Sequence, residues 1–363
     1  MKNKIHVLLL IAFSFLSACN HNDEPDFPTT PTDGRIALSY VAYYRSSMPD
    51  PTYLTHINYA FAELYMKDGE YLKFAVQGKK SRFDSVKRYV KSKNPNIKFL
   101  ISFTNSTDHL VNSGGFSQLV KSPEMRRKFA EDCKQFLIEE DIDGVDMNWE
   151  FPGMTWGSTE YDTKNDVKNY TLLIKELREV LGKDYLLTYA GYCRNKRPTN
   201  DGGYKYIDVK AVEPYVDYVN IMTYDFDAAP NHNAAWKDSD SYWDCERTIN
   251  EYLSIGATPS KLVLGIPFYG RTGWGSNGAH AYKSIIKLKA SDGYKIDNWD
   301  ESCGVTYVTK DGEFYCSYDN AKSIGVKGDK IRKLGLRGMM AWEYDLDDDE
   351  GTLRKALWNA VMK

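Results

Sequence analysis

Eight short apolar segments at nearly even spacing limit the folds open to this 363-residue chain more than any other feature. They are rich in Val, Ile, Tyr and Phe, which favour strands, and amphipathic segments lie between most of them. The eight are RIALSYVAY (35–43), LTHINYAFA (54–62), KFLISFT (98–104), IDGVDMNWE (142–150), YLLTYAGY (185–192), YVNIMTY (218–224), KLVLGIPFY (261–269) and LRGMMAWE (336–343). Eight strands alternating with helices predict an α/β fold whose parallel sheet closes into a (β/α)8 TIM barrel. An open doubly wound sheet is the alternative.

Two of the intervening segments have the periodicity of helices with one buried face. In MRRKFAEDCKQFLIEE (125–140), the residues Phe129, Cys133, Phe136 and Leu137 share one stripe. NDVKNYTLLIKELREVLG (165–182) behaves likewise and stops at a glycine, a common residue at helix ends. Both segments are therefore predicted to be helices that pack on the barrel.

Two connections depart from the strand–helix rhythm. The link YRSSMPDPTY (44–53) is too interrupted by proline for a full helix. The stretch from about 271 to 317 is long and contains its own hairpin, GVTYVTKDGEFYC (304–316). We expect a small α+β insertion there, between strands seven and eight. Cys303 and Cys316 flank its turn and could pair in an oxidising compartment.

The N-terminus has the features of a secretory segment rather than of a domain. Lysines precede a short apolar run, and Leu16-Ser17-Ala18-Cys19 resembles a bacterial lipobox in which Cys19 is lipidated. Residues 1–19 are thus predicted to be a lipoprotein signal, with an ordinary signal peptide as the alternative. Residues 20–34, rich in Pro, Asp and Thr, are expected to form a flexible tether, and residues 35–363 the barrel domain.

Charge and metal-ligand spacing exclude several functional classes. The net charge is −3 and no long basic run occurs, which argues against a nucleic-acid partner. The sequence has no CxxC pair and its six histidines form no HxxH or HxxxH pair, so no hydrolytic zinc site is indicated. No metal and no organic cofactor are expected.

The segment DIDGVDMNWEFPG (141–153) places polar side chains at a spacing of two. In a strand, Asp146, Asn148 and Glu150 would share one face and point into the barrel. Burying acids there is costly unless they are paired or used. Barrel enzymes place their chemistry at the C-terminal ends of strands, where Glu150 lies. This strand is therefore the predicted site, and a buried polar network that only fixes packing is the alternative.

DGVDMNWEFPG (143–153) resembles the DGxDxDxE signature of glycoside hydrolase family 18, the chitinase and chitinase-like family. Four further segments match patterns of that family in order: INYAFA (57–62), IMTYD (221–225), LGIPFYGR (264–271) and MMAWEYDLDDDEGTL (339–353). The resemblance runs from about Ile36 to Met362. It implies hydrolysis with retention at N-acetylglucosamine linkages by substrate-assisted catalysis, in which the substrate's own acetamido oxygen is the nucleophile.

The resemblance also implies roles for individual residues. Glu150 would protonate the leaving oxygen and then activate water, and Tyr224 would donate a hydrogen bond to the acetamido carbonyl. Asp225 would contact the sugar, and Met222 would face inward beside Tyr224. The remaining matches to substrate-binding positions are Trp342 as the floor of the bond-cleaving subsite, Tyr43 and Phe61 as its walls, and Arg271 on the substrate side.

The sequence departs from the signature at Asn148, where the family has its middle aspartate. An asparagine carbonyl can accept the acetamido hydrogen bond but supplies no negative charge to the oxazolinium ion. Losing such stabilisation commonly costs about 2.7–4 kcal/mol, although Asp146 could supply the charge instead. Losing a like charge should also lower the pKa of Glu150. We therefore expect weakened rather than abolished activity.

A second departure lies on the third strand, in ISFTNSTDH (101–109). Ser102 is retained, but Thr104 and Asn105 stand where chitinases usually carry glycines, so the sugar subsites there are expected to be reshaped.

The leading expectation is a monomeric, lipid-anchored enzyme of a bacterial envelope, in the outer membrane, that cleaves β-1,4-linked N-acetylglucosamine chains. An endo-β-N-acetylglucosaminidase acting on N-glycan cores is a closely related alternative. A surface glycan-binding protein without turnover is an alternative of another class, favoured by Asn148 and opposed by the retained Glu150. For all three alternatives, the expected partner of the protein is an oligosaccharide or polysaccharide that contains N-acetylglucosamine.

Overall fold

The structure is a computed structural model that describes residues 34–105, 115–154, 161–193, 196–197, 204–238, 240–241, 243–275 and 277–363. The predicted signal segment 1–19 with Cys19, and the predicted tether except Gly34, lie outside the described residues. So do residues 106–109 of the segment that departs from the family pattern on the third strand.

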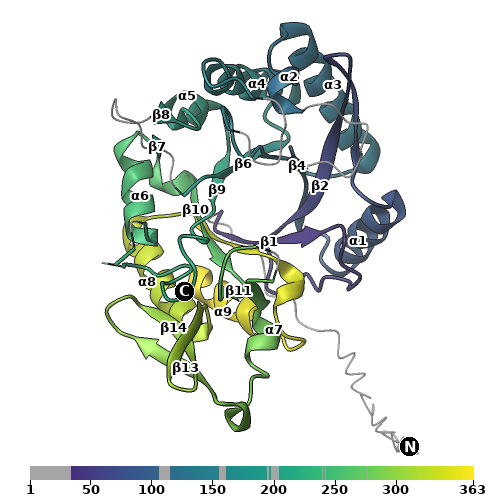
Figure 1. Ribbon diagram of the computed structural model, residues 1–363. Helices are drawn as coiled ribbons and strands as arrows, with labels where there is room; N and C mark the ends of the chain where they lie inside the picture. Colours follow the sequence, from purple (N-terminus) through teal and green to yellow (C-terminus); the bar gives the residue numbers. More distant parts are fainter. Residues whose placement is uncertain are drawn as a thin grey trace, which may run out of the picture.

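Eight parallel strands close into a barrel, which confirms the predicted fold (Figure 1). They are β1 (Ile36–Ala42), β2 (His56–Lys67), β4 (Lys98–Thr104), β5 (Gly144–Asn148), β6 (Leu186–Gly191), β9 (Tyr218–Ile221), β10 (Leu262–Pro267) and β16 (Gly338–Trp342). Each pairs with its neighbours in parallel, and β1 pairs with both β2 and β16, so the sheet has no open edge there. Every strand falls within one of the eight predicted segments, apart from an extension of β2.

Helices cover the outside of the barrel (Figure 1). The longer ones are α1 (Lys80–Lys93), α3 (Pro123–Glu140), α4 (Asp166–Leu181), α6 (Cys245–Ser254), α8 (Ala321–Leu334) and α9 (Thr352–Met362). The shorter elements are α2 (Phe116–Leu119), α5 (Val209–Val212) and the two-stranded pair β7 (Lys196–Arg197) and β8 (Tyr204–Lys205). None of the described helices has the length and apolar character needed to cross a bilayer. Residues 43–55, between β1 and β2, contain no helix, as predicted.

A hairpin partner of β2 was not predicted from the sequence. Strand β2 continues past the barrel to Lys67 and pairs in antiparallel fashion with β3 (Glu70–Val76). Charged and apolar residues do not alternate regularly in β3, and several of its side chains are exposed. Its sequence therefore carried little strand signal.

The predicted insertion is a separate antiparallel sheet beside the barrel (Figure 1). Its elements are β11 (Tyr269–Arg271), β12 (Ala279–Ala281), α7 (Tyr282–Ile285), β13 (Tyr294–Asp300), β14 (Val305–Lys310) and β15 (Glu313–Tyr318). The strand order is β12-β11-β15-β14-β13. The hairpin predicted around Asp311 and Gly312 is the β14–β15 turn.

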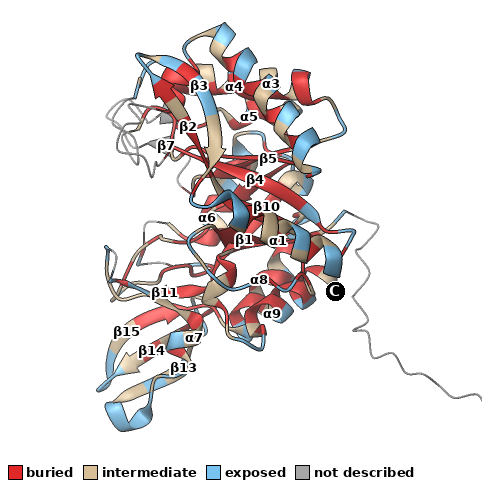
Figure 2. Ribbon diagram, turned by 90° about the vertical axis from the view of Figure 1, so that its right-hand side faces the viewer, coloured by how far each residue is buried: buried red, intermediate tan, exposed pale blue. Residues whose placement is uncertain are grey.

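Buried apolar side chains form two layers. The larger cluster lies between the strands and the helices, and the smaller one, which includes Leu38, Tyr40 and Met340, fills the barrel interior. Figure 2 shows the barrel strands almost wholly buried, while the helices turn exposed faces outward. The polar residues of β5, Asp146 and Asn148, are buried in this same barrel interior.

The suggested Cys303–Cys316 pair is not formed, because both residues are free cysteines. In the β14–β15 ladder Cys316 lies opposite Val308, whereas Cys303 precedes β14 altogether. The hairpin turn brings β14 and β15 together in a register that leaves the two sulfur atoms unpaired.

Candidate functional site

Strand β5 carries the predicted alternation of polar and apolar side chains. Asp146 and Asn148 are buried in the barrel, at 0% and 4% exposure, while Val145 and Met147 belong to the cluster that faces the helices. The strand starts at Gly144, where an added Cβ would lie 2.3 Å from the Leu186 carbonyl oxygen. A glycine at this position lets β5 approach β6 closely, and Gly144 pairs with Leu186 at the start of the β5–β6 ladder.

Asp146 is the centre of a closed hydrogen-bond network below the site. Its Oδ2 accepts from the Tyr40 hydroxyl and from Ser102 Oγ, both at 2.8 Å. Its Oδ1 accepts from Thr188 Oγ1 at 2.6 Å and from Asn220 Nδ2 at 3.3 Å. Burial nevertheless raises the pKa of Asp146 above its ordinary value. Because four donors occupy its oxygens, Asp146 fixes neighbouring strands and does not offer an acceptor to a ligand.

Glu150 follows the end of β5, and its surroundings raise the pKa of its carboxyl group. Burial raises its pKa, a hydrogen bond from the Asn148 side chain lowers it, and the charge of Asp225 raises it, with the result at about 7. Burial is the largest of these influences, and the predicted lowering of the Glu150 pKa by exchange of an aspartate for Asn148 stays a prediction, because it compares two different side chains at position 148. At neutral pH a substantial fraction of Glu150 is protonated.

Asn148 presents an unused acceptor at the same place. Its Oδ1 is buried and has no hydrogen-bond partner among the described residues. The residue lines a cavity, so the acceptor is placed where a ligand N–H could reach it. Buried polar groups are normally paired, so an orphan on a cavity wall points to a ligand.

Tyr224 and Asp225 follow β9 and reach the same cavity. Tyr224 is 7% exposed, and burial together with the charges of Glu150 and Asp225 raises its pKa well above the ordinary value. Tyr224 therefore keeps its proton and can donate a hydrogen bond. Asp225 accepts from the Tyr269 hydroxyl at 2.7 Å and from two Arg271 nitrogens at 2.5 and 2.8 Å. This arrangement holds the Asp225 carboxylate in one orientation.

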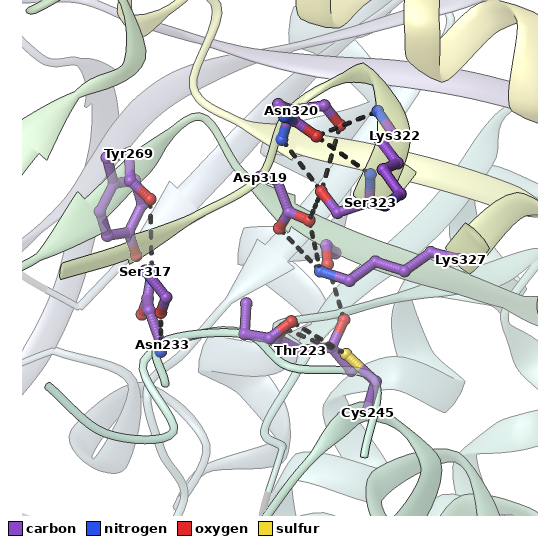
Figure 3. A network of polar contacts seen from close by, with 12 residues as sticks. Thr223, Asn233, Cys245, Tyr269, Ser317, Asp319, Asn320, Lys322, Ser323 and Lys327 are labelled. Atoms are coloured by element: carbon purple, nitrogen blue, oxygen red, sulfur yellow. Dashed lines mark hydrogen bonds and ion pairs between the residues drawn. The ribbon is translucent and has the colours of Figure 1, made fainter. Parts of the chain in front are cut away.

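The backbone of Asp225 is also fixed, by a residue of the loop that follows β9. Asp225 has the left-handed φ of 56°, and its N–H donates to Asn233 Oδ1 at 3.0 Å. Asn233 in turn donates its own N–H to Ser317 Oγ and its side-chain amide to the Tyr269 carbonyl, as Figure 3 shows. The insertion sheet thus supports the position of Asp225.

A second part of the network in Figure 3 anchors helix α8 behind the site. Lys327 Nζ donates to both oxygens of Asp319 at 2.8 and 2.7 Å, and both side chains are fully buried. Cys245 Sγ, at the start of α6, lies 3.7 Å from the carbonyl oxygen of Thr223, the residue before Tyr224. The ends of β9 and β15 are therefore tied to the helices behind them.

Two cavities meet at Glu150. The first, of about 450 Å³, has a polar end at Glu150 and an aromatic wall formed by Trp342 and Tyr40, whose rings lie 5.5 Å apart. The second, of about 360 Å³, shares Glu150, Met222, Tyr224 and Asp225 with the first, and three of its four other lining residues are aromatic. An acid flanked by two aromatic-lined cavities suits a ligand that continues on both sides of one bond.

Seven of the ten predicted site residues line the first cavity: Asn148, Glu150, Met222, Tyr224, Asp225, Arg271 and Trp342. Asp146, Tyr43 and Phe61 line neither of the two cavities. Tyr43 lies past the end of β1, where strand alternation no longer decides direction, and its ring meets Tyr44 edge-on. Phe61 stacks on the Trp342 ring, with the ring centroids 5.8 Å apart, and so supports that ring although it does not line the cavity.

Tyr40, Arg45 and Tyr269 are among the cavity-wall residues that sequence reasoning missed. Tyr40 had a detectable signal, because it alternates with Leu38 on the inward face of β1. Arg45 had none, since it lies in the irregular link after β1, where it pairs with Glu343, just after the neighbouring strand β16, at 2.7 Å.

Comparisons with known proteins agree with the fold described above. The family Glycosyl hydrolases family 18 matches residues 37–347. Chitinase A1 of Niallia circulans is 28% identical over 92% of this chain, which spans 60% of that protein. Chitotriosidase-1 of Mus musculus is 27% identical over 84% of this chain and 69% of its own length. A class V chitinase from Nicotiana tobaccum, solved in complex with NAG4, has the same fold, with a TM-score of 0.75 at 21% identity over 90% of this chain and 98% of that one.

Proposed function

Because the chain belongs to glycosyl hydrolase family 18, we propose that it cleaves β-1,4-linked N-acetylglucosamine chains with retention by substrate-assisted catalysis. One combination of residues gives this proposal its strongest support. A glutamate with a pKa of about 7, an orphan amide acceptor at Asn148 and a protonated Tyr224 line the same cavity. An acetamido group bound there would receive a hydrogen bond at its carbonyl and donate one through its N–H.

In this mechanism Glu150 protonates the glycosidic oxygen while the acetamido carbonyl oxygen attacks the anomeric carbon. The leaving alcohol departs with the Glu150 proton, and the sugar closes to an oxazolinium ion. Glu150, now a carboxylate, takes a proton from water as that water opens the ring with overall retention. Tyr224 holds the attacking oxygen, Asn148 holds the acetamido N–H, and Trp342 supports the apolar face of the sugar.

Asn148 makes the proposed enzyme slower than one with a carboxylate at that position, since a neutral amide does not stabilise the positive charge of the oxazolinium ion. Asn148→Asp is therefore expected to raise kcat by on the order of 10²–10³-fold, corresponding to about 2.7–4 kcal/mol. Steady-state kinetics on chitotetraose measures it. Asn148→Ala, which removes the acceptor without adding charge, should lower kcat instead. An equal kcat in wild type and Asn148→Asp would contradict this role.

The pH dependence follows from the raised pKa of Glu150. Glu150 has to be protonated to donate to the leaving oxygen, so kcat/KM is expected to fall as the pH rises through about 7. In Asn148→Asp the added like charge should move this limb to higher pH. A profile of kcat/KM from acidic to alkaline pH measures both. A flat profile across neutrality would mean that a group other than Glu150 donates the proton.

We propose chitin or its oligosaccharides as substrate, a monomeric chain, and an anchor to the outer membrane of a bacterial envelope through lipidated Cys19. An N-glycan core is the second candidate substrate. A binding role without turnover is favoured only by the neutral residue at position 148, because the acid and the tyrosine are retained.

The proposal is tested on residues 20–363 with chitotetraose as substrate and mass spectrometry of the products over hours. Glu150→Gln serves as the blank. Products that form with wild type and vanish in the blank would support the proposal, and their sizes would map the subsites on each side of Glu150. An unchanged tetraose would direct the search to N-glycan substrates or to a binding role.

A further inference from the structure

A cluster of metal-ligating side chains lies outside the two cavities. His232 and Asp238 belong to the loop between β9 and α6, and Cys303 lies in the turn between β13 and β14 of the insertion sheet. One ligand atom from each of the three falls within 4.8 Å of the others. None of the three lines either cavity described above. The insertion therefore brings Cys303 next to two residues of a loop that lies 65 positions or more earlier in the sequence.

His232 is oriented as a ligand would be. Its Nδ1 is buried and has no partner among the described residues. Its other ring nitrogen, Nε2, lies 3.5 Å from Asp300 Oδ2, and the ring meets Phe314 edge-on at 5.5 Å. A carboxylate on the far side of an imidazole is the usual second partner of a metal-bound histidine, because it fixes the ring and leaves the other nitrogen's lone pair for the metal.

The two other members are held by backbone contacts that do not use all their ligand capacity. Asp238 is 4% exposed, and its Oδ1 accepts the N–H groups of Asp240 and Ser241. The carbonyl oxygen of Cys303 accepts from the N–H groups of Trp236 and Lys237, so the turn and the loop are already docked. These contacts fix the backbone on both sides of the cluster.

We propose that His232 Nδ1, the Asp238 carboxylate and Cys303 Sγ bind one divalent transition-metal ion of the zinc type, with water as the fourth ligand. Cysteine, histidine and aspartate together are ligands that zinc prefers. Atoms bound to one tetrahedral zinc lie roughly 3.3–3.8 Å apart by its bond lengths, so modest side-chain rotations close the site. The Cys303 thiol proton is released to solvent when sulfur binds the metal.

The role of such an ion is structural. His232 is followed by Asn233, which holds the Asp225 backbone, and Cys303 belongs to the insertion sheet. A metal would therefore cross-link the loop that positions Asp225 to the sheet behind it. The sequence showed no such site because its ligands stand 6 and 65 positions apart, without the short spacing of known zinc motifs.

The test uses the purified full chain, stripped with a chelator, then incubated with Zn²⁺ alone and passed through gel filtration. Elemental analysis is expected to find one more equivalent of zinc in wild type than in Cys303→Ser or Asp238→Asn. The second variant keeps the side-chain shape and the Oδ1 acceptor, so it decides the question if Cys303→Ser folds poorly. Cys133→Ala and His280→Ala serve as matched controls and should retain the metal, because neither residue belongs to the cluster. Cys19 is present in every variant and therefore contributes equally to each measurement.

Co²⁺ provides an independent readout of the sulfur ligand. Wild type loaded with Co²⁺ should show a thiolate charge-transfer band in the near ultraviolet that is absent from Cys303→Ser and present in Cys133→Ala. Zn²⁺ should also raise the Tm of wild type and leave that of Asp238→Asn unchanged. Equal zinc content in wild type and both ligand variants, or no retained zinc in wild type, would overturn the proposal.

Discussion

Glu150→Gln is expected to lower kcat on chitotetraose by roughly 10²–10⁴-fold, the usual contribution of a positioned general acid, with little change in KM. Glutamine has nearly the same shape and can still accept the hydrogen bond from Asn148, so binding should persist. It has no proton to give to the leaving oxygen. Steady-state kinetics on the purified variant measures both constants.

The matched control for this variant is Glu139→Gln, which makes the same chemical change on the exposed face of α3. It should leave kcat within error of wild type. A Glu150→Gln enzyme that keeps most of its rate would show that another acid on the cavity wall donates the proton. Asp225 would be the first to examine, although Arg271 and Tyr269 hold its carboxylate.

Lys327→Met is expected to lower the free energy of unfolding by about 3–5 kcal/mol, because it leaves Asp319 as an uncompensated buried charge. Both side chains of this pair are 0% exposed, and Ser323 Oγ also donates to Asp319. The pair joins α8 to the end of β15, so its loss should loosen the packing of the insertion sheet on the barrel. Urea unfolding followed by circular dichroism gives the difference.

Lys333→Met is the control for Lys327→Met, since Lys333 lies exposed in the last turn of the same helix. Its effect should stay within about 0.5 kcal/mol. Replacing both charges, with Asp319→Leu added to Lys327→Met, should recover part of the lost stability because no unpaired charge remains. If Lys327→Met were as stable as its control, the buried pair would contribute nothing.

The barrel could be predicted from the sequence because its strands are buried on both faces. Such strands are continuous apolar runs, and segments such as KLVLGIPFY (261–269) stand out from the amphipathic helices around them. Strand β3 escaped detection because it extends outside the barrel, where partial exposure lets charged residues interrupt the pattern. A continuous apolar run reveals a strand that is buried on both faces, but it does not reveal one such as β3, whose side chains are partly exposed.

The site was predictable only where strand alternation or a family motif decided the direction of a side chain. Glu150 and Tyr224 follow directly from the ends of β5 and β9. Tyr43 lies one residue beyond β1 and does not line the cavity, whereas Tyr40, within β1, does. Asn233, which holds Asp225, lies in an irregular loop, where no spacing rule indicates which backbone N–H an amide will meet.

The anomeric configuration of the first product tests the central claim most directly. Wild type would be mixed with chitotetraose and followed by proton NMR before the new reducing end mutarotates. Substrate-assisted catalysis with Glu150 as acid and base predicts that the β-anomer appears first, and that Glu150→Gln yields neither anomer. An α-anomer appearing first, or no product that depends on Glu150, would contradict the account.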